Sequence, residues 1–316
     1  LPGVPLRLPP LTEKDREDVK FAVAQEVDYL ALSFVRRADD ITQLKELLQE
    51  MGADIPIVAK IEKQEALDHF AEILEVSDGI MIARGDLGVE IEPERVPLHQ
   101  KMIIRRCREK GIPVITATQM LESMRFNPRP TRAEASDVAN AIFDGTDALM
   151  LSGETAIDRY PVEAVRSMAR IAEITEGALP YRRWLEQVYL EPSRTITDAI
   201  GQATCEMAME LEAKAIITST VSGYTARMVA RHRPATPIIA TTPDSRTYRR
   251  LALVWGVQPL LVKEFATTDE MISTTVEAAV KKKLLQREDL VIITAGIPVG
   301  GRGRTNMIKV HRVGYA

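Results

Sequence analysis

Histidine, cysteine and aromatic residues are scarce in this chain of 316 residues, which holds 4 His and 2 Cys and is 5% aromatic. So few histidines disfavour a zinc-based or histidine-based mechanism. Cys107 and Cys205 lie far apart within helical patterns, which is typical of buried reduced thiols rather than of a disulfide or a metal pair. A core poor in aromatic rings must be built from Ile, Val, Leu, Ala and Met, and that composition suits parallel sheets covered by helices.

Long apolar runs and a strong net charge are also missing. No stretch approaches the roughly 18 apolar residues that a membrane span needs, and no signal peptide is visible at the start. The net charge of -4 and the pI of about 5.8 argue against a nucleic-acid binder. We therefore expect a cytoplasmic protein that binds neither a membrane nor nucleic acid.

Patterns of β-strand and α-helix alternate along the first half of the chain, which indicates βαβ units and a parallel sheet. A closed (β/α)8 TIM barrel needs eight strands. Residues 1–178 therefore predict either an open sheet or a partial barrel made of about its last five βα units, and the proline-rich start favours the partial barrel. We expect strands at 28–34, 55–62, 79–84, 112–117 and 147–152, and helices at 12–25, 38–51, 64–75, 97–110, 131–143 and 161–177.

The alternation stops at residues 179–195, which we expect to form a connection, and resumes over residues 196–316. This second half is predicted to be a compact, doubly wound α/β domain. Its expected helices are 197–211, 223–232, 244–254 and 268–284, and its expected strands are 214–218, 237–241, 257–263, 289–294 and 306–312.

Polar residues follow all five strands expected in residues 1–178. Parallel barrel strands end on one face, where such folds keep their active sites, so we expect these residues to lie together. A single hydroxyl at a strand end is more simply read as a helix cap, and it is the convergence that favours a site. The residues are Ser33 and Phe34, Lys60 and Glu62, Gly85 and Asp86, Thr118, and Ser152 and Glu154.

Lys60 and Glu62 are two residues apart, so in a strand they project to the same side. Buried charges are costly unless they are paired or bind something, and a purely structural ion pair is the alternative interpretation. Glu62 and Asp86 supply two hard oxygens of the kind that Mg²⁺ (or Mn²⁺) takes. Lys60 is a cation suited to a transferring phosphoryl group. The pattern predicts phosphoryl or enolate chemistry with a divalent metal.

Thr131 and Glu134 have the spacing of a capping box, which predicts a helix start at that point. Arg129 and Arg132 flank this start. For them surface ion pairing is the first interpretation, and a phosphate or subunit contact is the second. Asp137, further along the same helix, is interpreted as a polar anchor to a neighbouring loop.

Seven blocks of the chain, taken in order, resemble the signature blocks of pyruvate kinases. The resemblance covers essentially the whole chain, and blocks of this length are highly specific. They are 59–62 (AKIE), 83–88 (ARGDLG), 115–124 (ITATQMLESM), 129–140 (RPTRAEASDVAN), 151–155 (LSGET), 251–256 (LALVWG) and 293–300 (ITAGIPVG).

The resemblance implies an allosteric, glycolytic, ATP-binding phosphotransferase that makes pyruvate and ATP from phosphoenolpyruvate and ADP, in cytoplasmic homotetramers. It implies that Glu62 and Asp86 bind the Mg²⁺ that also holds the substrate, and that Lys60 stabilises the phosphoryl group in flight. It places the substrate carboxylate on Thr118 and on the amides of Gly85 and Asp86. Ser33 and Phe34 would line the pocket, while Ser152, Glu154 and Thr118 would deliver a proton to the enolate.

The second half resembles the family's regulatory domain. A strand end rich in hydroxyls opens a helix there, and backbone N–H groups and hydroxyls at such a turn form a phosphate cradle. An ordinary helix cap with short turns is the alternative. The implied site for a phosphorylated effector, a sugar phosphate or a nucleotide, comprises Thr218, Ser219, Thr220, Ser222, Gly223, Thr225, Arg302 and Gly303.

Three barrel strands and a lid domain of the family have no counterpart in this sequence. By resemblance they carry the ligands of a K⁺ ion and much of the ADP site. We therefore expect these residues to belong to a longer polypeptide, which an intact mass near 35.2 kDa would contradict. We expect the 316 residues alone to be inactive. A non-catalytic effector-binding module and a metal-dependent lyase of a pyruvate enolate are the alternative functions.

Overall fold

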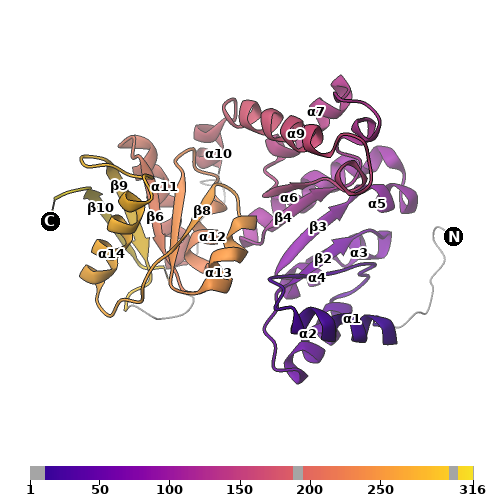
Figure 1. Cartoon of the computed structure of the whole chain (residues 1–316), viewed down its shortest axis with the longest axis horizontal. Coiled ribbons are helices and arrows are strands. Elements are labelled where there is room, and N and C mark those ends of the chain that lie inside the picture. Colours follow the sequence, from indigo (N-terminus) through magenta and orange to yellow (C-terminus); the bar gives the residue numbers. More distant parts are fainter. Residues whose placement is uncertain (1–10, 188–194, 299–304, 316) are drawn as a thin grey trace. The chain divides into compact units, whose positions relative to one another are not determined.

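The computed structural model describes residues 11–187, 195–298 and 305–315. It divides into two compact units, Leu1–Leu179 and Pro180–Ala316 (Figure 1). The proline-rich start, residues 1–10, lies outside the described residues.

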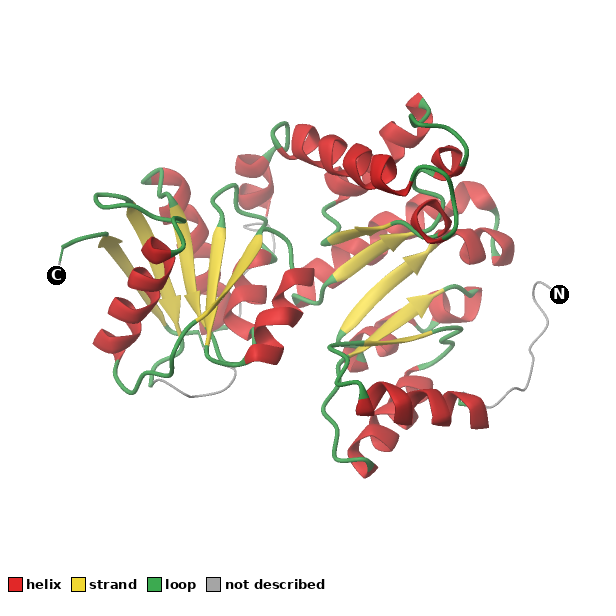
Figure 2. Ribbon diagram, viewed as in Figure 1, coloured by secondary structure: helices red, strands yellow, loops and turns green. Residues whose placement is uncertain are grey.

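The first unit is built on a five-stranded parallel sheet in the order β1-β2-β3-β4-β5 (Figure 2). Neighbours in sequence are neighbours in the sheet, and all four pairings are parallel. The strands are β1 (Leu30–Leu32), β2 (Ile57–Ile61), β3 (Gly79–Ala83), β4 (Val114–Ala117) and β5 (Ala148–Met150). Strand order that follows chain order is the arrangement of consecutive βα units in a barrel wall, so the predicted partial barrel is confirmed.

Helices connect these strands, and their ends follow local sequence signals. Thr12 and Thr131 close full capping boxes at the starts of α1 and α7, and the one at Thr131 is the box that the sequence predicts. Gly111 ends α6 with φ of +68°, a conformation that favours glycine. The helices are α1 (Glu13–Ala24), α2 (Ala38–Glu50), α3 (Gln64–Asp68), α4 (Phe70–Val76), α5 (Arg84–Glu90), α6 (Val96–Lys110), α7 (Arg132–Asp144), α8 (Gly153–Ala156) and α9 (Pro161–Glu176).

The two faces of this sheet are covered very differently. The face of β2 that carries Ile57, Ala59 and Ile61 joins a large core with residues of α1, α2, α4 and α6. The opposite face carries Val58 and Met81 in a small cluster made only of residues in or beside the strands. Because side chains alternate along a strand, Lys60 projects from the same face as Val58 and Met81.

The second unit has a mixed five-stranded sheet in the order β10-β9-β6-β7-β8, with β10 antiparallel to β9 and the other pairs parallel. Apolar clusters cover both faces, which confirms the predicted doubly wound α/β domain. The strands are β6 (Ala215–Ser219), β7 (Ile238–Thr242), β8 (Val257–Leu261), β9 (Leu290–Ala295) and β10 (Met307–Arg312), and the helices are α10 (Tyr181–Gln187), α11 (Ile196–Glu210), α12 (Tyr224–Ala230), α13 (Ser245–Arg250) and α14 (Thr268–Lys281).

The short helices α5 and α8 were not among the expected elements, and the structure differs from expectation at three further places. The helix expected at 64–75 is two helices, because the backbone at His69 (φ -105°, ψ 17°) leaves the helical region. The helix expected at 244–254 ends at Arg250 and continues as a 3₁₀ turn. Part of the expected connection 179–195 is the helix α10, whose Trp184 packs edge-on against Trp255; residues 188–194 lie outside the described part.

Both cysteines are free and buried, Cys107 in α6 and Cys205 in α11, as predicted. Burial raises the pKa of the Cys205 thiol, which suits an inert core residue. In the described part of the chain, every helix is too short or too polar to cross a lipid bilayer.

Candidate functional site

The parallel sheet of the first unit brings all five polar strand ends to one edge, because parallel strands share a direction. The register of the sheet aligns Leu32 with Ala59, Lys60 with Met81, and Ala83 with Ala117. The residues that follow β1, β2, β3, β4 and β5 therefore emerge along one rim of the sheet. This rim is the candidate active site.

Lys60 and Glu62 form an ion pair, with 2.6 Å between Nζ and Oε1. The Lys60 ammonium also donates a hydrogen bond of 2.7 Å to Ser33 Oγ, and the amide of Phe34 donates one of 2.7 Å to Glu62 Oε2. The ion pair that the sequence left open as a structural alternative is thus present. It joins the ends of β1 and β2 and leaves a quarter of the Lys60 side chain exposed (24%) beside a buried carboxylate (1%).

Glu62 and Asp86 follow neighbouring strands, and their carboxylates suit a hard cation. Glu62 is buried and held by its two partners, whereas Asp86 is exposed in the first turn of α5. Across residues 11–187, 195–298 and 305–315, no group of three or more His, Cys, Asp or Glu side chains is arranged around a metal position. Two protein carboxylates are nevertheless the usual protein share of a Mg²⁺ site, since substrate oxygens and water complete the octahedron. The donor set therefore fits magnesium.

Thr118 and Gly85 join the ends of β3 and β4. The amide of Gly85 donates a hydrogen bond of 2.7 Å to Thr118 Oγ1, and this hydroxyl donates one of 2.7 Å to the carbonyl of Ala117. Thr118 and Gln119 both have positive φ, +67° and +56°. Such backbone is uncommon for residues other than glycine and clusters at functional sites.

Ser152 and Glu154 lie beyond β5, at the start of α8. The Glu154 carboxylate is buried and accepts hydrogen bonds from the amides of Leu121 (3.1 Å) and Ser152 (2.8 Å). It therefore ties the loop after β5 to the loop after β4, which carries Thr118. Ser152 Oγ is a buried atom with no hydrogen-bond partner among the described residues. A hydroxyl in this state is available to a bound molecule.

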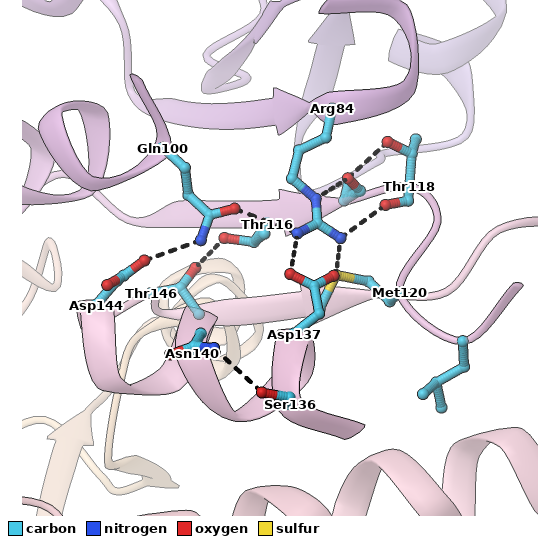
Figure 3. Close-up of polar contacts among 12 residues, drawn as sticks. Arg84, Gln100, Thr116, Thr118, Met120, Ser136, Asp137, Asn140, Asp144 and Thr146 are labelled. Carbon is cyan, nitrogen blue, oxygen red and sulfur yellow. Dashed lines mark hydrogen bonds and ion pairs between the residues drawn. The ribbon is translucent and has the colours of Figure 1, made fainter. Parts of the chain in front are cut away.

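Arg84 is a residue of this rim that the sequence reasoning did not single out (Figure 3). It is the first residue of α5, and its guanidinium pairs with Asp137 of α7 at 2.7 Å. The carbonyl of Thr118 accepts a further hydrogen bond from it at 3.0 Å. Its position in the sequence could have pointed to it, because an arginine directly after a buried strand needs a hydrogen-bond acceptor when its charge is buried. Asp137, which was predicted to anchor a neighbouring loop, instead pairs with this first residue of the helix α5.

Arg129 and Arg132 are both exposed beside the start of α7. Among the described residues neither forms a salt bridge, although surface pairing was the first interpretation for them. That interpretation finds no support in this part of the chain.

In the second unit the residues of the expected effector site surround the end of β6. Thr218, Ser219, Thr220 and Thr225 are buried, whereas Ser222 is exposed. Gly223 has φ of +77°, which requires the glycine. Arg302 and Gly303, the other two residues of the expected site, lie outside the described residues.

Thr305, which precedes β10, contacts Thr225 of α12 and Thr197 of α11. Thr305 Oγ1 donates to Thr225 Oγ1 at 3.0 Å, and the Thr305 amide donates to Thr197 Oγ1 at 3.4 Å. Thr218 Oγ1 is buried and has no hydrogen-bond partner in the described part. In the sheet, β7 and β8 lie to one side of β6 and β9 lies to the other. Ligands of doubly wound folds bind at such a switch point, beyond the carboxyl ends of the strands.

Comparison with known proteins gives two family matches. The family described as "Pyruvate kinase, barrel domain" matches residues 1–165, and the family described as "Pyruvate kinase, alpha/beta domain" matches residues 198–311.

Curated relatives match over almost the whole chain. Pyruvate kinase of Geobacillus stearothermophilus is 57% identical over 312 residues, which cover 98% of this chain and 53% of the relative. Pyruvate kinase of Sporosarcina psychrophila is 53% identical over 315 residues, covering 99% and 54%. That of Staphylococcus aureus strain N315 is 52% identical over 314 residues, also covering 99% and 54%. The chain spans about half the length of these relatives.

Proposed function

Because the chain belongs to the pyruvate kinase family, we propose that the protein carrying it transfers the phosphoryl group of phosphoenolpyruvate to ADP, giving pyruvate and ATP. The observation that carries this proposal is the rim where Lys60, Glu62 and Ser33 are joined by short polar contacts. Asp86 follows the neighbouring strand there. A cation and two carboxylates at adjacent strand ends are the groups that phosphoryl transfer needs.

Glu62 and Asp86 would hold the divalent metal, Mg²⁺ or Mn²⁺. When bound, that ion would supply charge that neutralises the phosphate and enolate oxygens. Burial of Glu62 and its hydrogen bond from Phe34 fix one donor before any ligand arrives. Asp86, which is exposed, is the donor that adjusts its position.

Lys60 would stabilise the phosphoryl group during transfer. Its ammonium has three donors, of which Glu62 and Ser33 take two. The third can point to an equatorial phosphoryl oxygen, where a positioned cation stabilises developing charge. Glu62 and Ser33 hold the ammonium in place. Lys60 pairs with the Glu62 carboxylate, which leaves the charge of the Asp86 carboxylate for the metal.

Thr118 and the amides of Gly85 and Asp86 would hold the substrate carboxylate, and Ser33 and Phe34 would line the pocket. The exposed ring of Phe34 already lies 5.7 Å from Lys63 Nζ. Thr118 Oγ1 can turn from its present partners to a bound carboxylate, because a hydroxyl both donates and accepts.

A proton must reach the enolate carbon once the phosphoryl group has left. We assign its delivery to Thr118, Ser152 and Glu154. The buried, unpartnered Ser152 Oγ and the Glu154 carboxylate, which links the two loops, are the features that support this assignment.

The residues of this chain provide the phosphoenolpyruvate side of the reaction. By family resemblance the ADP side and the K⁺ ligands lie outside these 316 residues, so we expect the chain alone to be inactive. The glycolytic role would place the protein in the cytoplasm, as a homotetramer.

The second unit would bind a phosphorylated effector, a sugar phosphate or a nucleotide. Thr218, Ser219, Thr220, Ser222, Gly223 and Thr225 gather at the carboxyl end of β6, at the switch point of the sheet, and Arg302 and Gly303 belong to the same assignment. Support comes from the positive φ of Gly223 and the buried, unpartnered hydroxyl of Thr218.

The function is tested by incubating the complete protein with phosphoenolpyruvate, ADP, Mg²⁺ and K⁺ and measuring ATP and pyruvate. We expect both products in equal amounts and only when ADP is present. Pyruvate formed without ADP would instead support the metal-dependent lyase. Binding of a phosphorylated effector without any turnover would support the non-catalytic module.

A further inference from the structure

The Arg84 side chain is almost completely buried, with 10% of it exposed, and its guanidinium reaches three separate segments. Asp137 of α7 accepts from Nη1 at 2.7 Å, and Gln100 of α6 accepts from the same nitrogen at 3.3 Å. The other nitrogens reach the turn after β4, where Nη2 donates to the Thr118 carbonyl and lies 2.7 Å from Met120 Sδ. Figure 3 shows the guanidinium between α7 and this turn.

The contacts to the turn fall on both sides of one residue. Nε lies 3.4 Å from the carbonyl oxygen of Ala117 and Nη2 lies 3.0 Å from that of Thr118. These two carbonyls belong to the two peptide planes that flank the Thr118 Cα, and the rotation of those planes defines φ and ψ of Thr118. One rigid, planar guanidinium therefore restrains both backbone angles of Thr118.

This restraint acts where the backbone needs it. Thr118 is β-branched and has φ of +67°, and Gln119 follows with φ of +56°. Such conformations persist only when the surroundings hold them. The hydroxyl of Thr118, oriented in this way, accepts the hydrogen bond from the Gly85 amide. Gly85 is the residue next to Arg84. Two consecutive residues therefore bind Thr118, Arg84 at its backbone carbonyl and Gly85 at its hydroxyl.

The network behind Arg84 is itself anchored. Gln100 donates from Nε2 to Asp144 Oδ2 at 2.9 Å, and Lys101 pairs with the same carboxylate. Two acidic residues of α7, Asp137 and Asp144, thus connect this helix to Arg84 directly and through Gln100. The acceptor positions around the guanidinium are fixed by α6 and α7.

We propose that Arg84 is a positioning residue for Thr118: its guanidinium fixes the backbone of the turn and so places the threonine hydroxyl for the substrate carboxylate and for protonation of the enolate. This inference rests on the proposed function for the role of Thr118. The geometric part, that Arg84 orders the turn, stands independently of any activity. Lysine is a poor substitute, because one ammonium cannot span two carbonyls and a carboxylate as the planar fork does.

The experiment compares the complete protein with its Arg84→Lys and Asp137→Asn variants, and with Arg105→Lys as a matched control. Arg105 pairs with Glu109 on the surface of α6, with 69% of its side chain exposed. Hydrogen–deuterium exchange, followed by mass spectrometry, is measured for peptides covering residues 84–90 and 117–121. Initial rates and pH profiles of ATP formation from phosphoenolpyruvate and ADP are measured in parallel.

We expect exchange at the Gly85 amide to become at least about tenfold faster in Arg84→Lys, while exchange in β2 and α9 stays unchanged. kcat should fall by about 100-fold, as for other displacements of a positioned group, with a smaller rise in KM for phosphoenolpyruvate. Asp137→Asn should show the same pattern more weakly, and Arg105→Lys should match the wild type. Asp137→Asn gives the decisive comparison if Arg84→Lys does not fold.

Unchanged Gly85 exchange in a folded variant would overturn the proposal. So would faster exchange spread evenly over the first unit, because that is the result of a purely structural ion pair. Faster Gly85 exchange with wild-type kcat and pH profile would overturn the catalytic part. If the wild type forms no ATP, the proposed function fails, while the exchange data still decide whether Arg84 orders the turn.

Discussion

The amide of Gly85 donates a hydrogen bond of 2.7 Å to the hydroxyl of Thr118 and thereby joins the ends of β3 and β4. Gly85 lies in the first turn of α5, and Thr118 presents its hydroxyl from a turn with positive φ. The same contact both completes the rim of the sheet and orients a group assigned to substrate binding.

Replacing Thr118 by valine keeps the shape of the side chain and removes this acceptor. The Gly85 amide then loses its partner, which should lower the free energy of unfolding by about 1–3 kcal/mol. Loss of a group that transfers a proton should lower kcat by about 10²–10⁴-fold. Urea denaturation and the ATP assay measure the two effects.

Thr116→Val is the matched control, because Thr116 is a buried threonine of β4, the strand that Thr118 follows, and its hydroxyl donates to Thr146. It should lose stability and keep kcat. Equal kcat values for the two variants would contradict the role of Thr118.

Removing either proposed metal ligand should weaken metal binding. In Glu62→Gln and Asp86→Asn, we expect the affinity for Mn²⁺, measured by electron paramagnetic resonance, to fall at least about tenfold. Removing a residue that only hydrogen-bonds to a metal ligand already lowers metal affinity about 10–100-fold, so removing a ligand itself should have at least this effect. Glu72→Gln, a change at an exposed carboxylate of α4, is the control and should bind Mn²⁺ as the wild type does. Wild-type affinity in both ligand variants would rule out the two-carboxylate site.

Asp244 should make a stabilising contribution that disappears in acid. The Thr247 amide donates to its carboxylate at 2.6 Å, and this hydrogen bond lowers the pKa of Asp244 below its ordinary value of 3.8. A carboxyl with a lower pKa in the folded state stabilises above its unfolded pKa, and that stability is lost as the pH falls through its folded pKa. Asp244→Ala should therefore cost about 1 kcal/mol at pH 7 and less below about pH 4.

The control for this prediction is Thr267→Ala, which removes a neutral cap from α14. The loss of unfolding free energy in Thr267→Ala should not become smaller on acidification as it does in Asp244→Ala. Urea denaturation of both variants at pH 7 and in steps below pH 4 tests whether the contribution of Asp244 decreases in acid. A cost for Asp244→Ala that stays constant over this range would contradict the assignment.

Comparing Gly223 with Gly256 distinguishes the cost of a positive φ from the cost of a steric clash when glycine is replaced by alanine. Both have positive φ, +77° and +61°, but a Cβ at Gly223 would lie 3.1 Å from Leu251 Cδ2, whereas one at Gly256 would meet nothing within 4 Å. Gly256→Ala should cost about 1–2 kcal/mol from the backbone alone, and Gly223→Ala should cost more because buried Leu251 must move. Equal midpoints in urea would show that the close approach has no effect.

Much of the fold follows from the sequence. Alternating apolar runs and capping signals locate all ten strands and most helices within a few residues, because periodicity and caps are local properties. The division of helix 64–75 at His69 has no such signal, and neither does α10, whose Trp184 is held by packing against Trp255.

The candidate site was predictable where the chemistry is concentrated at strand ends. Lys60 and Glu62 carry charges whose burial is costly without a partner or a ligand, and Asp86 and Thr118 carry polar groups after the next two strands. Arg84 was not singled out, because its partners Gln100 and Asp137 lie 16 and 53 residues away in the chain. Contacts at such separations depend on how helices pack, which a local pattern does not encode.

The most direct test of the central claim is the rate of ATP formation by the complete protein when Lys60 is replaced by methionine. Lys45→Met is the matched control, since Lys45 pairs with Asp78 at 3.1 Å, at the end of the sheet where the Asp78 carboxylate caps the start of β2. We predict that Lys60→Met folds and binds the phosphorylated effector but forms ATP at least about 1,000-fold more slowly, whereas Lys45→Met keeps the wild-type rate. A wild-type rate in folded Lys60→Met would contradict the proposal that this rim transfers the phosphoryl group.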